Sequence, residues 1–391
     1  MNLTRVFIIL SSLILGFLSP SCGQKSTTAD PCSHILSGGQ ISTLFEKPPC
    51  LEGYITMQSG PLLRFGPDSI EIRDSTFRVE KMKIASDGFM INGWLYLPPG
   101  DDRYPLIVLT NGGGGDPGRI KSLSDWIAPV LAHCGVAAFV HDKRGTGESE
   151  GVYRNTTYED YITDAGNCAH YLSNHKNIDP GRIGILGGSE GGRIAVIAAK
   201  RYDVFSFAIS YAGTVVSAID DRINAQKGWL LSQNLADTAF SEIMALHEKS
   251  IRAWASEKPA EHDAVNLEID LARSRYSRSL LPWKKEEMDT IPAFDEVLPT
   301  WNSLSADYMS EMEHFNKRWL AIFGESDQVV PTKSSVENIL KYMPLSGNKD
   351  YSVAILPDVG HAPVNTKTNR MVRLDNLIIN WMREQGILKP L

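Results

Sequence analysis

The chain has 391 residues, which is long enough for one large domain with insertions or for two domains. With 42% hydrophobic and 22% charged residues, its composition is that of an ordinary globular protein. Its 39 Lys and Arg residues against 46 Asp and Glu residues give a net charge of −7 at pH 7. Because the charge is negative and no long basic run occurs, nucleic acid is not an expected partner.

The amino terminus has the pattern of an export signal. Arg5 precedes an apolar run over residues 6–18, and small residues with Pro20 then lead to Cys22. The run is too short to favour a helix that spans a membrane. We therefore expect residues 1–22 to be a signal peptide. Cys22 resembles the lipid-modified cysteine of a bacterial lipoprotein, whereas Pro20 departs from that pattern, so a membrane-tethered or periplasmic lipoprotein and a simply secreted protein both stay open.

Four further cysteines follow this segment. Cys32 and Cys50 are candidates for a disulfide in an exported protein. Cys134 and Cys168 lie in apolar, helix-like surroundings and are expected to be buried thiols. The sequence has no CxxC pair and no His/Cys cluster, so no metal site is expected.

Residues 23–76 carry the weakest pattern of the chain. Ser, Thr, Gly and Pro are frequent over residues 26–49, which suits a tether followed by a small irregular segment of unknown role. Regular alternation of apolar and polar residues begins near residue 77. Residues 79–84 and 90–97 both alternate, with a turn between them, and this predicts a β-hairpin.

A glycine-rich loop follows the next predicted strand. Residues 104–110 form an apolar run typical of a buried strand, and residues 111–116 then read Asn-Gly-Gly-Gly-Gly-Asp. Such a loop leaves backbone N–H groups bare, and in an esterase it lends a donor to the oxyanion hole. The alternatives are a flexible turn or a phosphate-binding loop, but the endings that a phosphate loop needs do not occur here.

The chain then continues with alternating helix and strand patterns. Residues 120–133 are expected to be a helix, residues 135–141 a buried strand, and residues 158–175 an amphipathic helix. Asp142 and Arg144 lie in the turn that follows the strand. We interpret these two side chains as structural groups that fix the turn by hydrogen bonds.

Residues 183–193 have the pattern of a nucleophile elbow. An apolar run over residues 183–186 predicts a strand, and residues 193–201 have the composition of a helix. Between them the sequence reads Gly187-x-Ser189-x-Gly191. Small residues are needed there because a serine held in a sharp turn leaves no room for neighbouring side chains.

The alternation of strand and helix stops after the next strand, over residues 205–213. Residues 214–315 are rich in helical patterns, and an insertion of this size between two core strands is expected to act as a lid over the active site. We interpret its tryptophans mainly as the core of the lid, with some of them lining the pocket: Trp229, Trp254, Trp283 and Trp301.

Strands and helices resume after the insertion, and two more candidate residues follow predicted strands. The strand over residues 318–323 precedes Asp327, and the strand over residues 351–356 precedes His361. The remaining patterns predict helices over residues 332–342 and 372–385.

Ser189, Asp327 and His361 occur in the order serine, acid, histidine, which α/β-hydrolases share. Serine is a poor nucleophile near neutral pH, so it needs an imidazole to take its proton. The imidazole in turn needs a carboxylate that holds its tautomer and stabilises its charged form. The rivals for these two roles are Glu325 and Asp358 among the acids and His133 and His141 among the histidines.

From about residue 77 onward the chain resembles a serine hydrolase of the α/β-hydrolase superfamily. It is similar to bacterial carboxylesterases and dienelactone-hydrolase-like enzymes in its Gly-rich loop, in the Asp-x-Arg-Gly-x-Gly-x-Ser turn at 142–149 and in the Gly-x-Ser-Glu-Gly-Gly elbow at 187–192. The loop 324–331 resembles the acid loop of the superfamily and places Asp327 as the acid. Relatives often carry histidine where this chain has Gly188, which opens space beside Ser189.

The resemblance implies a mostly parallel sheet flanked by helices over residues 77–391, with a helical lid over residues 214–315. It also implies an oxyanion hole made by the backbone N–H of Glu190 and one from Gly112 or Gly113. The expected reaction is hydrolysis of a small carboxylic ester through an acyl-enzyme, without a metal or organic cofactor. An exported peptidase, an acyltransferase and a non-catalytic surface binding protein stay open as alternatives, and the oligomeric state is not predicted.

Overall fold

The computed structural model describes residues 35–36, 77–113, 127–256, 258–284, 287 and 298–388. The expected signal peptide, Cys22, the Cys32 and Cys50 pair, and most of the segment 23–76 lie outside the described residues, as does the part of the Gly-rich loop after Gly113. Within them no helix is both long and apolar enough to cross a membrane.

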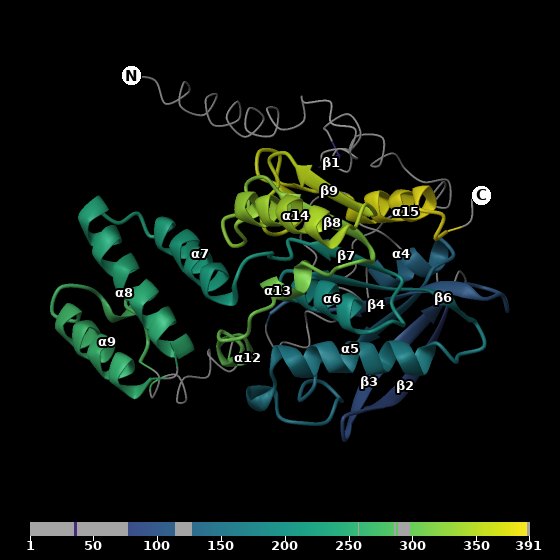
Figure 1. The fold of residues 1–391 in the computed structure, drawn as a ribbon, viewed down its shortest axis with the longest axis horizontal. Coiled ribbons are helices and arrows are strands. Elements are labelled where there is room, and N and C mark those ends of the chain that lie inside the picture. Colours follow the sequence, from purple (N-terminus) through teal and green to yellow (C-terminus); the bar gives the residue numbers. More distant parts are fainter. Residues whose placement is uncertain are drawn as a thin grey trace.

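In the part of the chain that the structure describes, a nine-stranded, mostly parallel sheet forms the centre of the molecule (Figure 1). Its strand order is β1-β9-β8-β7-β6-β4-β5-β3-β2, and only the β2–β3 and β3–β5 pairs are antiparallel. The strands are β1 (Ile35–Leu36), β2 (Arg78–Ser86), β3 (Phe89–Leu97), β4 (Tyr104–Thr110), β5 (Ala137–His141), β6 (Ile178–Gly188), β7 (Phe207–Tyr211), β8 (Arg318–Gly324) and β9 (Tyr351–Leu356). The predicted hairpin and central strands are confirmed.

Helices cover both faces of the sheet, which is why the parallel strands are apolar at nearly every position. On β8, Ala321 and Phe323 pack under α5 (Tyr158–Leu172), α6 (Glu190–Arg201) and α14 (Thr332–Ser346). The alternate residues Leu320 and Ile322 pack under α4 (Ala128–His133) and α15 (Leu374–Glu384) on the other face. The short strands β10 (Val364–Asn365) and β11 (Arg370–Met371) form a separate small sheet.

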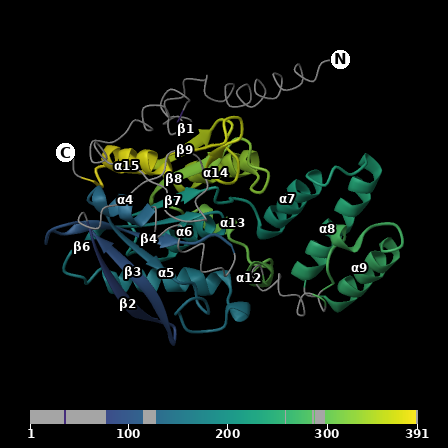
Figure 2. The ribbon, with the colours of Figure 1, turned by 180° about the vertical axis from the view of Figure 1, so that it is seen from behind.

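The segment between β7 and β8 is helical, as predicted for residues 214–315. It contains α7 (Ala218–Leu231), α8 (Asp237–Ser256), α9 (Pro259–Ala272), the 3₁₀ turns of η6 (Arg278–Leu280), α12 (Leu298–Asn302) and α13 (Met309–Met312). Helices α7, α8 and α9 stand beside the sheet rather than on either of its faces (Figures 1 and 2). They bury small apolar clusters of their own, so this insertion has its own core.

The turn after β5 is fixed by the two side chains predicted to hold it. Asp142 Oδ2 accepts hydrogen bonds from Asn92 Nδ2 at 3.0 Å and from the backbone N–H of Glu148 at 2.9 Å. Arg144 donates to both oxygens of the buried Asp164 carboxylate, at 2.7 and 3.2 Å. These contacts tie the turn to β3 and to α5, which agrees with a structural role for both residues.

One of the two cysteines expected as buried thiols differs from that prediction. Cys134 follows the last residue of α4 and is disulfide-bonded, with a partner outside the described residues. Apolar neighbours in the sequence predict burial, but they carry no information about which distant segment approaches the end of a helix. Cys168 is a buried free thiol as expected, and burial raises its pKa well above the usual range.

Candidate active site

Ser189 lies in the sharp turn between β6 and α6. Its backbone has φ 55° and ψ −124°, a combination that costs free energy for any residue with a side chain. The turn is held from both sides, since the Ser189 N–H donates to Tyr211 O at 2.8 Å and Ser189 O accepts from the Gly192 N–H at 2.9 Å. The predicted elbow is therefore present, and it places the serine at the carboxyl end of the central strand β6.

The glycines of the elbow are required by close backbone approach. A Cβ atom at Gly187 would lie 2.0 Å from Gly191 O, and one at Gly191 would lie 2.5 Å from Asn111 O. A Cβ at Gly188 would meet nothing nearer than Tyr211 O at 3.8 Å. The space beside the serine that the sequence predicted at Gly188 is thus open.

His361 lies between Ser189 and Asp327. Its Nδ1 is 3.0 Å from Asp327 Oδ2, and its Nε2 is 3.1 Å from Ser189 Oγ. A carboxylate can only accept, so in the neutral imidazole Nδ1–H donates to Asp327 and the Nε2 lone pair faces the serine hydroxyl. Three side chains that are far apart in the sequence therefore form one hydrogen-bonded chain.

The Asp327 side chain is completely buried and is held by the loop that follows it. Its Oδ1 accepts hydrogen bonds from the backbone N–H groups of Val329 and Val330, at 2.8 and 2.9 Å. These bonds leave Oδ2 for His361 and fix the direction in which the carboxylate points. The sequence pattern of the acid loop is consistent with this geometry.

The rival residues have other partners. Glu325 Oε2 accepts from the backbone N–H of Asp358 at 3.2 Å, and the Asp358 carboxylate lies 2.9 Å from Lys367 Nζ. His141 is buried and stacks on Phe139, with a ring-centroid distance of 5.9 Å, and burial lowers its pKa. The structure thus brings His361 and Asp327, rather than these rivals, to the serine.

A cavity of about 180 Å³ opens above Ser189. Gly113 lines it from the Gly-rich loop, while Asp221, Arg222 and Thr300 line it from the helical insertion. The insertion therefore supplies part of the wall of the site. Among the residues that the structure describes, no group of three or more His, Cys, Asp or Glu side chains is arranged to hold a metal ion.

Lys143 connects the Gly-rich loop to the residue after the serine. Its position in the sequence did not single it out as part of the site. Its Nζ donates to Gly112 O and to Glu190 Oε1, both at 2.6 Å, and the two side chains of this ion pair are 5% and 6% exposed. In a trans peptide the C=O and the next N–H point in opposite directions. By holding the Gly112 carbonyl, Lys143 therefore fixes the orientation of the Gly113 N–H.

The helical insertion contacts this site through α7 and α12. Thr300 Oγ1 donates to Glu190 Oε2 at 2.6 Å, and Asn224 Nδ2 donates to Val329 O at 2.7 Å. A Cβ at Gly228 would lie 2.1 Å from Gln328 O, so α7 packs directly on the loop that carries Asp327. The Glu190 side chain is thus a point where the core and the insertion meet.

Comparison with known proteins supports the fold. Residues 121–248 match the model of the prolyl oligopeptidase family of peptidases. The α/β-hydrolase GrgF from Penicillium superposes with a TM-score of 0.51 at 16% identity, over 80% of this chain and 98% of its own. Est1E from Butyrivibrio proteoclasticus, solved with ferulic acid bound, superposes with a TM-score of 0.50 at 17% identity, over 79% of this chain and 100% of its own.

The chain is an α/β-hydrolase by fold. Sequence relatives cover less of it: the thiohydrolase AneE of Aspergillus aculeatus is 33% identical over 118 residues, which is 30% of this chain and 35% of that protein. The chain spans between 20% and 47% of the length of the curated relatives that it matches. The family model covers Ser189 and ends before Asp327 and His361.

The buried Glu190 predicts how the stability of this α/β-hydrolase depends on pH. Burial opposes the charged form, but the charge and hydrogen bond of Lys143, together with the hydrogen bond from Thr300, outweigh it and hold the pKa of Glu190 below its ordinary value of 4.5. Below pH 4.5 the unfolded chain binds a proton that the folded chain does not, until the pH falls below the folded pKa. The ion pair therefore stabilises the fold above this interval, and the stabilisation is lost as the pH falls through it.

As the pH falls below 4.5, we expect Glu190→Gln to lose stability less steeply than the wild type, by up to about 1.4 kcal/mol per pH unit. Urea unfolding followed by tryptophan fluorescence at several pH values measures this. Glu268→Gln is the control, because Glu268 pairs with Lys249 on the surface. Parallel curves for wild type and Glu190→Gln would contradict the prediction.

Proposed function

We propose that this protein is a serine hydrolase that cleaves carboxylic esters through an acyl-enzyme. The observation that carries the proposal is the position of His361, within hydrogen-bonding distance of both Ser189 Oγ and Asp327 Oδ2. A nucleophile, a base and a group that orients the base are the three parts that acyl transfer to serine requires.

In the proposed reaction Ser189 Oγ attacks the ester carbonyl while its proton passes to His361 Nε2. Asp327 keeps Nδ1 protonated and stabilises the imidazolium that forms. The tetrahedral intermediate collapses, and the leaving alcohol takes the proton from Nε2. Water then enters, gives its proton to the same nitrogen and attacks the acyl-enzyme, which releases the acid and restores Ser189.

Two backbone N–H groups are proposed to bind the negative oxygen of the tetrahedral intermediates. The N–H of Glu190 is the first of α6, and the first N–H groups of a helix have no acceptor within it and lie at the positive end of its dipole. The second donor comes from Gly112 or Gly113, and the orientation of the Gly113 N–H is the one that Lys143 fixes. Such donors act without reorganisation because they are already in place.

We further propose that the helical insertion is a lid and that the protein is exported. The lid role is supported by the contacts of Thr300 with Glu190 and of α7 with the Asp327 loop, which join the insertion to the catalytic residues. Export, by cleavage alone or as a lipoprotein modified at Cys22, is supported by the sequence of residues 1–22. Cells that express the full chain are labelled with palmitate, and their membrane and soluble fractions are then separated. Label on a membrane-bound protein indicates a lipoprotein, whereas an unlabelled soluble protein indicates cleavage alone.

A peptidase of the same fold is the second candidate, and the match to the prolyl oligopeptidase family favours it. An ester and an amide with the same acyl group separate the two activities. We expect the kcat/KM of the ester to exceed that of the amide by far more than their difference in intrinsic reactivity. If the protein accelerates ester and amide cleavage by similar factors over their uncatalysed rates, it would be a peptidase that also cleaves esters.

A fluorophosphonate probe tests the proposed nucleophile. We expect the probe to label Ser189, because only a hydroxyl activated by a base attacks its phosphorus quickly. Peptide mass mapping locates the adduct. Labelling should be absent in Ser189→Ala and at least about a hundredfold slower in His361→Ala. A folded wild-type protein that remains unlabelled would overturn the mechanism.

Replacing Lys143 tests the role of the Gly-rich loop. We expect Lys143→Met to lower kcat by about tenfold to a hundredfold with a smaller change in KM. A Gly113 N–H that points away from the oxyanion no longer makes a hydrogen bond that forms mainly in the transition state. Lys81→Met is the control, since Lys81 forms a salt bridge with Glu148 in which both side chains are about half exposed. Equal kinetic effects of the two substitutions would exclude a positioning role for Lys143.

A further inference from the structure

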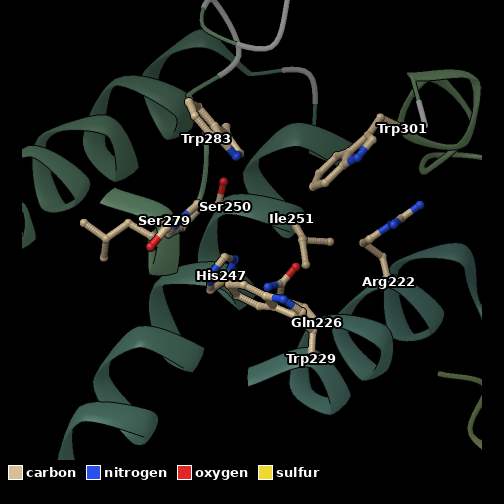
Figure 3. Close-up of a pocket in the computed structure, with 11 residues that line it drawn as sticks. Arg222, Gln226, Trp229, His247, Ser250, Ile251, Ser279, Trp283 and Trp301 are labelled. Atoms are coloured by element: carbon tan, nitrogen blue, oxygen red, sulfur yellow. The ribbon is translucent and has the colours of Figure 1, made fainter. Parts of the chain in front are cut away.

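A second cavity lies inside the helical insertion, between α7, α8 and the segment 279–283. Its volume is about 200 Å³, and the indole rings of Trp229, Trp283 and Trp301 surround it (Figure 3). Ile251 forms part of the same wall from α8. Small-molecule sites are typically concave, aromatic and apolar with a few polar groups. This cavity has those properties.

The second cavity adjoins the one above Ser189. Arg222 lines both cavities. Two successive residues of α12 line one cavity each, Thr300 the cavity above Ser189 and Trp301 the second cavity. A molecule with its ester at Ser189 that is longer than the first cavity therefore extends past Arg222 toward the tryptophans. The order along this path is nucleophile, cation, aromatic cavity.

The guanidinium of Arg222 has no hydrogen bond or salt bridge with any residue that the structure describes. It lies over the ring of Trp301, 5.4 Å from the centroid. The nearby acids have other direct partners, because Asp221 lies 3.5 Å from Arg193 and Glu190 is bound by Lys143. The Arg222 charge acts on Glu190 only as one of the smaller causes that lower its pKa. An arginine at the wall of two cavities, with donors that no described residue engages, is suited to bind a carboxylate, which it can hold with two parallel hydrogen bonds.

The other polar side chains of the second cavity are uncharged at neutral pH. Burial lowers the pKa of His247 to about 4, although a hydrogen bond to Leu280 O opposes this. The Nε2–H of His247 donates to that carbonyl at 2.8 Å. Gln226, Ser250 and Ser279 complete the polar lining, and none of these side chains carries a charge. The cavity thus provides a neutral, aromatic interior, with the positive charge at the side that faces the serine.

We propose that this cavity is a specificity subsite for the aromatic ring of the substrate, and that Arg222 binds a carboxylate located between that ring and the scissile ester. This inference rests on the proposed ester hydrolysis and adds the substrate class to it. A cavity of about 150 Å³ is sufficient to hold benzene, so about 200 Å³ accommodates one six-membered ring. Acyl esters of aromatic 2-hydroxy acids have this order of groups, as do monoesters of arylmethyl malonic acids.

Binding of 3-phenyllactate to the full chain with Ser189→Ala tests the subsite without any turnover. Isothermal titration calorimetry should show that the acid binds about tenfold or more tightly than its neutral amide, 3-phenyllactamide. Arg222→Gln should remove this preference, and Arg222→Lys should retain part of it. Arg252→Gln, which removes the same charge from an exposed pair on α8, should leave it unchanged.

The aromatic part of the proposal is tested with 3-cyclohexyllactate, which has a ring of similar size and no π-system. Trp229→Leu should weaken the binding of 3-phenyllactate more than that of 3-cyclohexyllactate, by about threefold or more, because a ring–ring contact is lost only for the former. Trp229 is suitable for substitution because it is 40% exposed and is not part of a packed core. Equal weakening of both ligands would overturn the aromatic assignment.

Kinetics then separate this proposal from the one on which it rests. Methyl butanoate reports ester hydrolysis alone, while O-acetyl-3-phenyllactate and monomethyl benzylmalonate present the carboxylate and ring on the alcohol side and the acyl side. For the faster of these two substrates, we compare kcat/KM with that of the same ester carrying a carboxamide in place of the carboxylate. Arg222→Gln should lower this ratio by about tenfold or more.

Hydrolysis of methyl butanoate without any preference for the charged aromatic esters would overturn the subsite and leave the proposed function standing. If the protein binds 3-phenyllactate through Arg222 but cleaves none of these esters, the proposed subsite would be supported and the proposed ester hydrolysis would be wrong. Equal binding of acid and amide by the unsubstituted subsite would overturn the role of Arg222 directly.

Discussion

The close contact between β6 and α6 at Gly187 and Gly191 is the constraint on which the site depends. Because neither residue has a side chain, the carbonyl of one can lie where the Cβ of the other would be, and the chain reverses within a few residues. Ser189 is then held at φ 55° by the sheet on one side and the first turn of the helix on the other. Its hydroxyl is presented at the sheet edge where β8 and β9 also end, and the loops after those strands bring Asp327 and His361 to it.

The buried pair of Lys143 and Glu190 extends this arrangement beyond Ser189, Asp327 and His361, the three residues proposed to be catalytic. The Lys143 ammonium group holds the Gly-rich loop and Glu190, the residue after Ser189, and Thr300 joins the helical insertion to the same carboxylate. Removing one member of a buried ion pair is costly because it leaves the other charge without compensation. The loop, the elbow and the insertion are thus positioned by one network, which gives a physical reason for changes in the insertion to affect the chemistry at Ser189.

Local patterns were sufficient for the elements that each depend on a short stretch of chain. The hairpin of β2 and β3 follows from alternation around Asp87 and Gly88, and the elbow follows from a strand, two spaced glycines and a helix. Ser189, Asp327 and His361 were predicted because each follows a core strand. The sequence did not reveal the contacts of Lys143, the disulfide of Cys134 or the separate second cavity inside the insertion, because these depend on which distant segments meet. A lysine between an aspartate and an arginine looks like part of the same solvated turn until the fold buries it.

The central claim, that Ser189 carries the acyl group during turnover, is tested most directly by rapid-quench mass spectrometry with a slowly hydrolysed ester. We expect a transient mass increase equal to the acyl group, located on the peptide that contains Ser189 and absent from Ser189→Ala. Its rate of formation should fall in His361→Ala. Turnover of the ester by the wild type with no acylated species at any time point, or unchanged turnover in Ser189→Ala, would rule out an acyl-enzyme at Ser189.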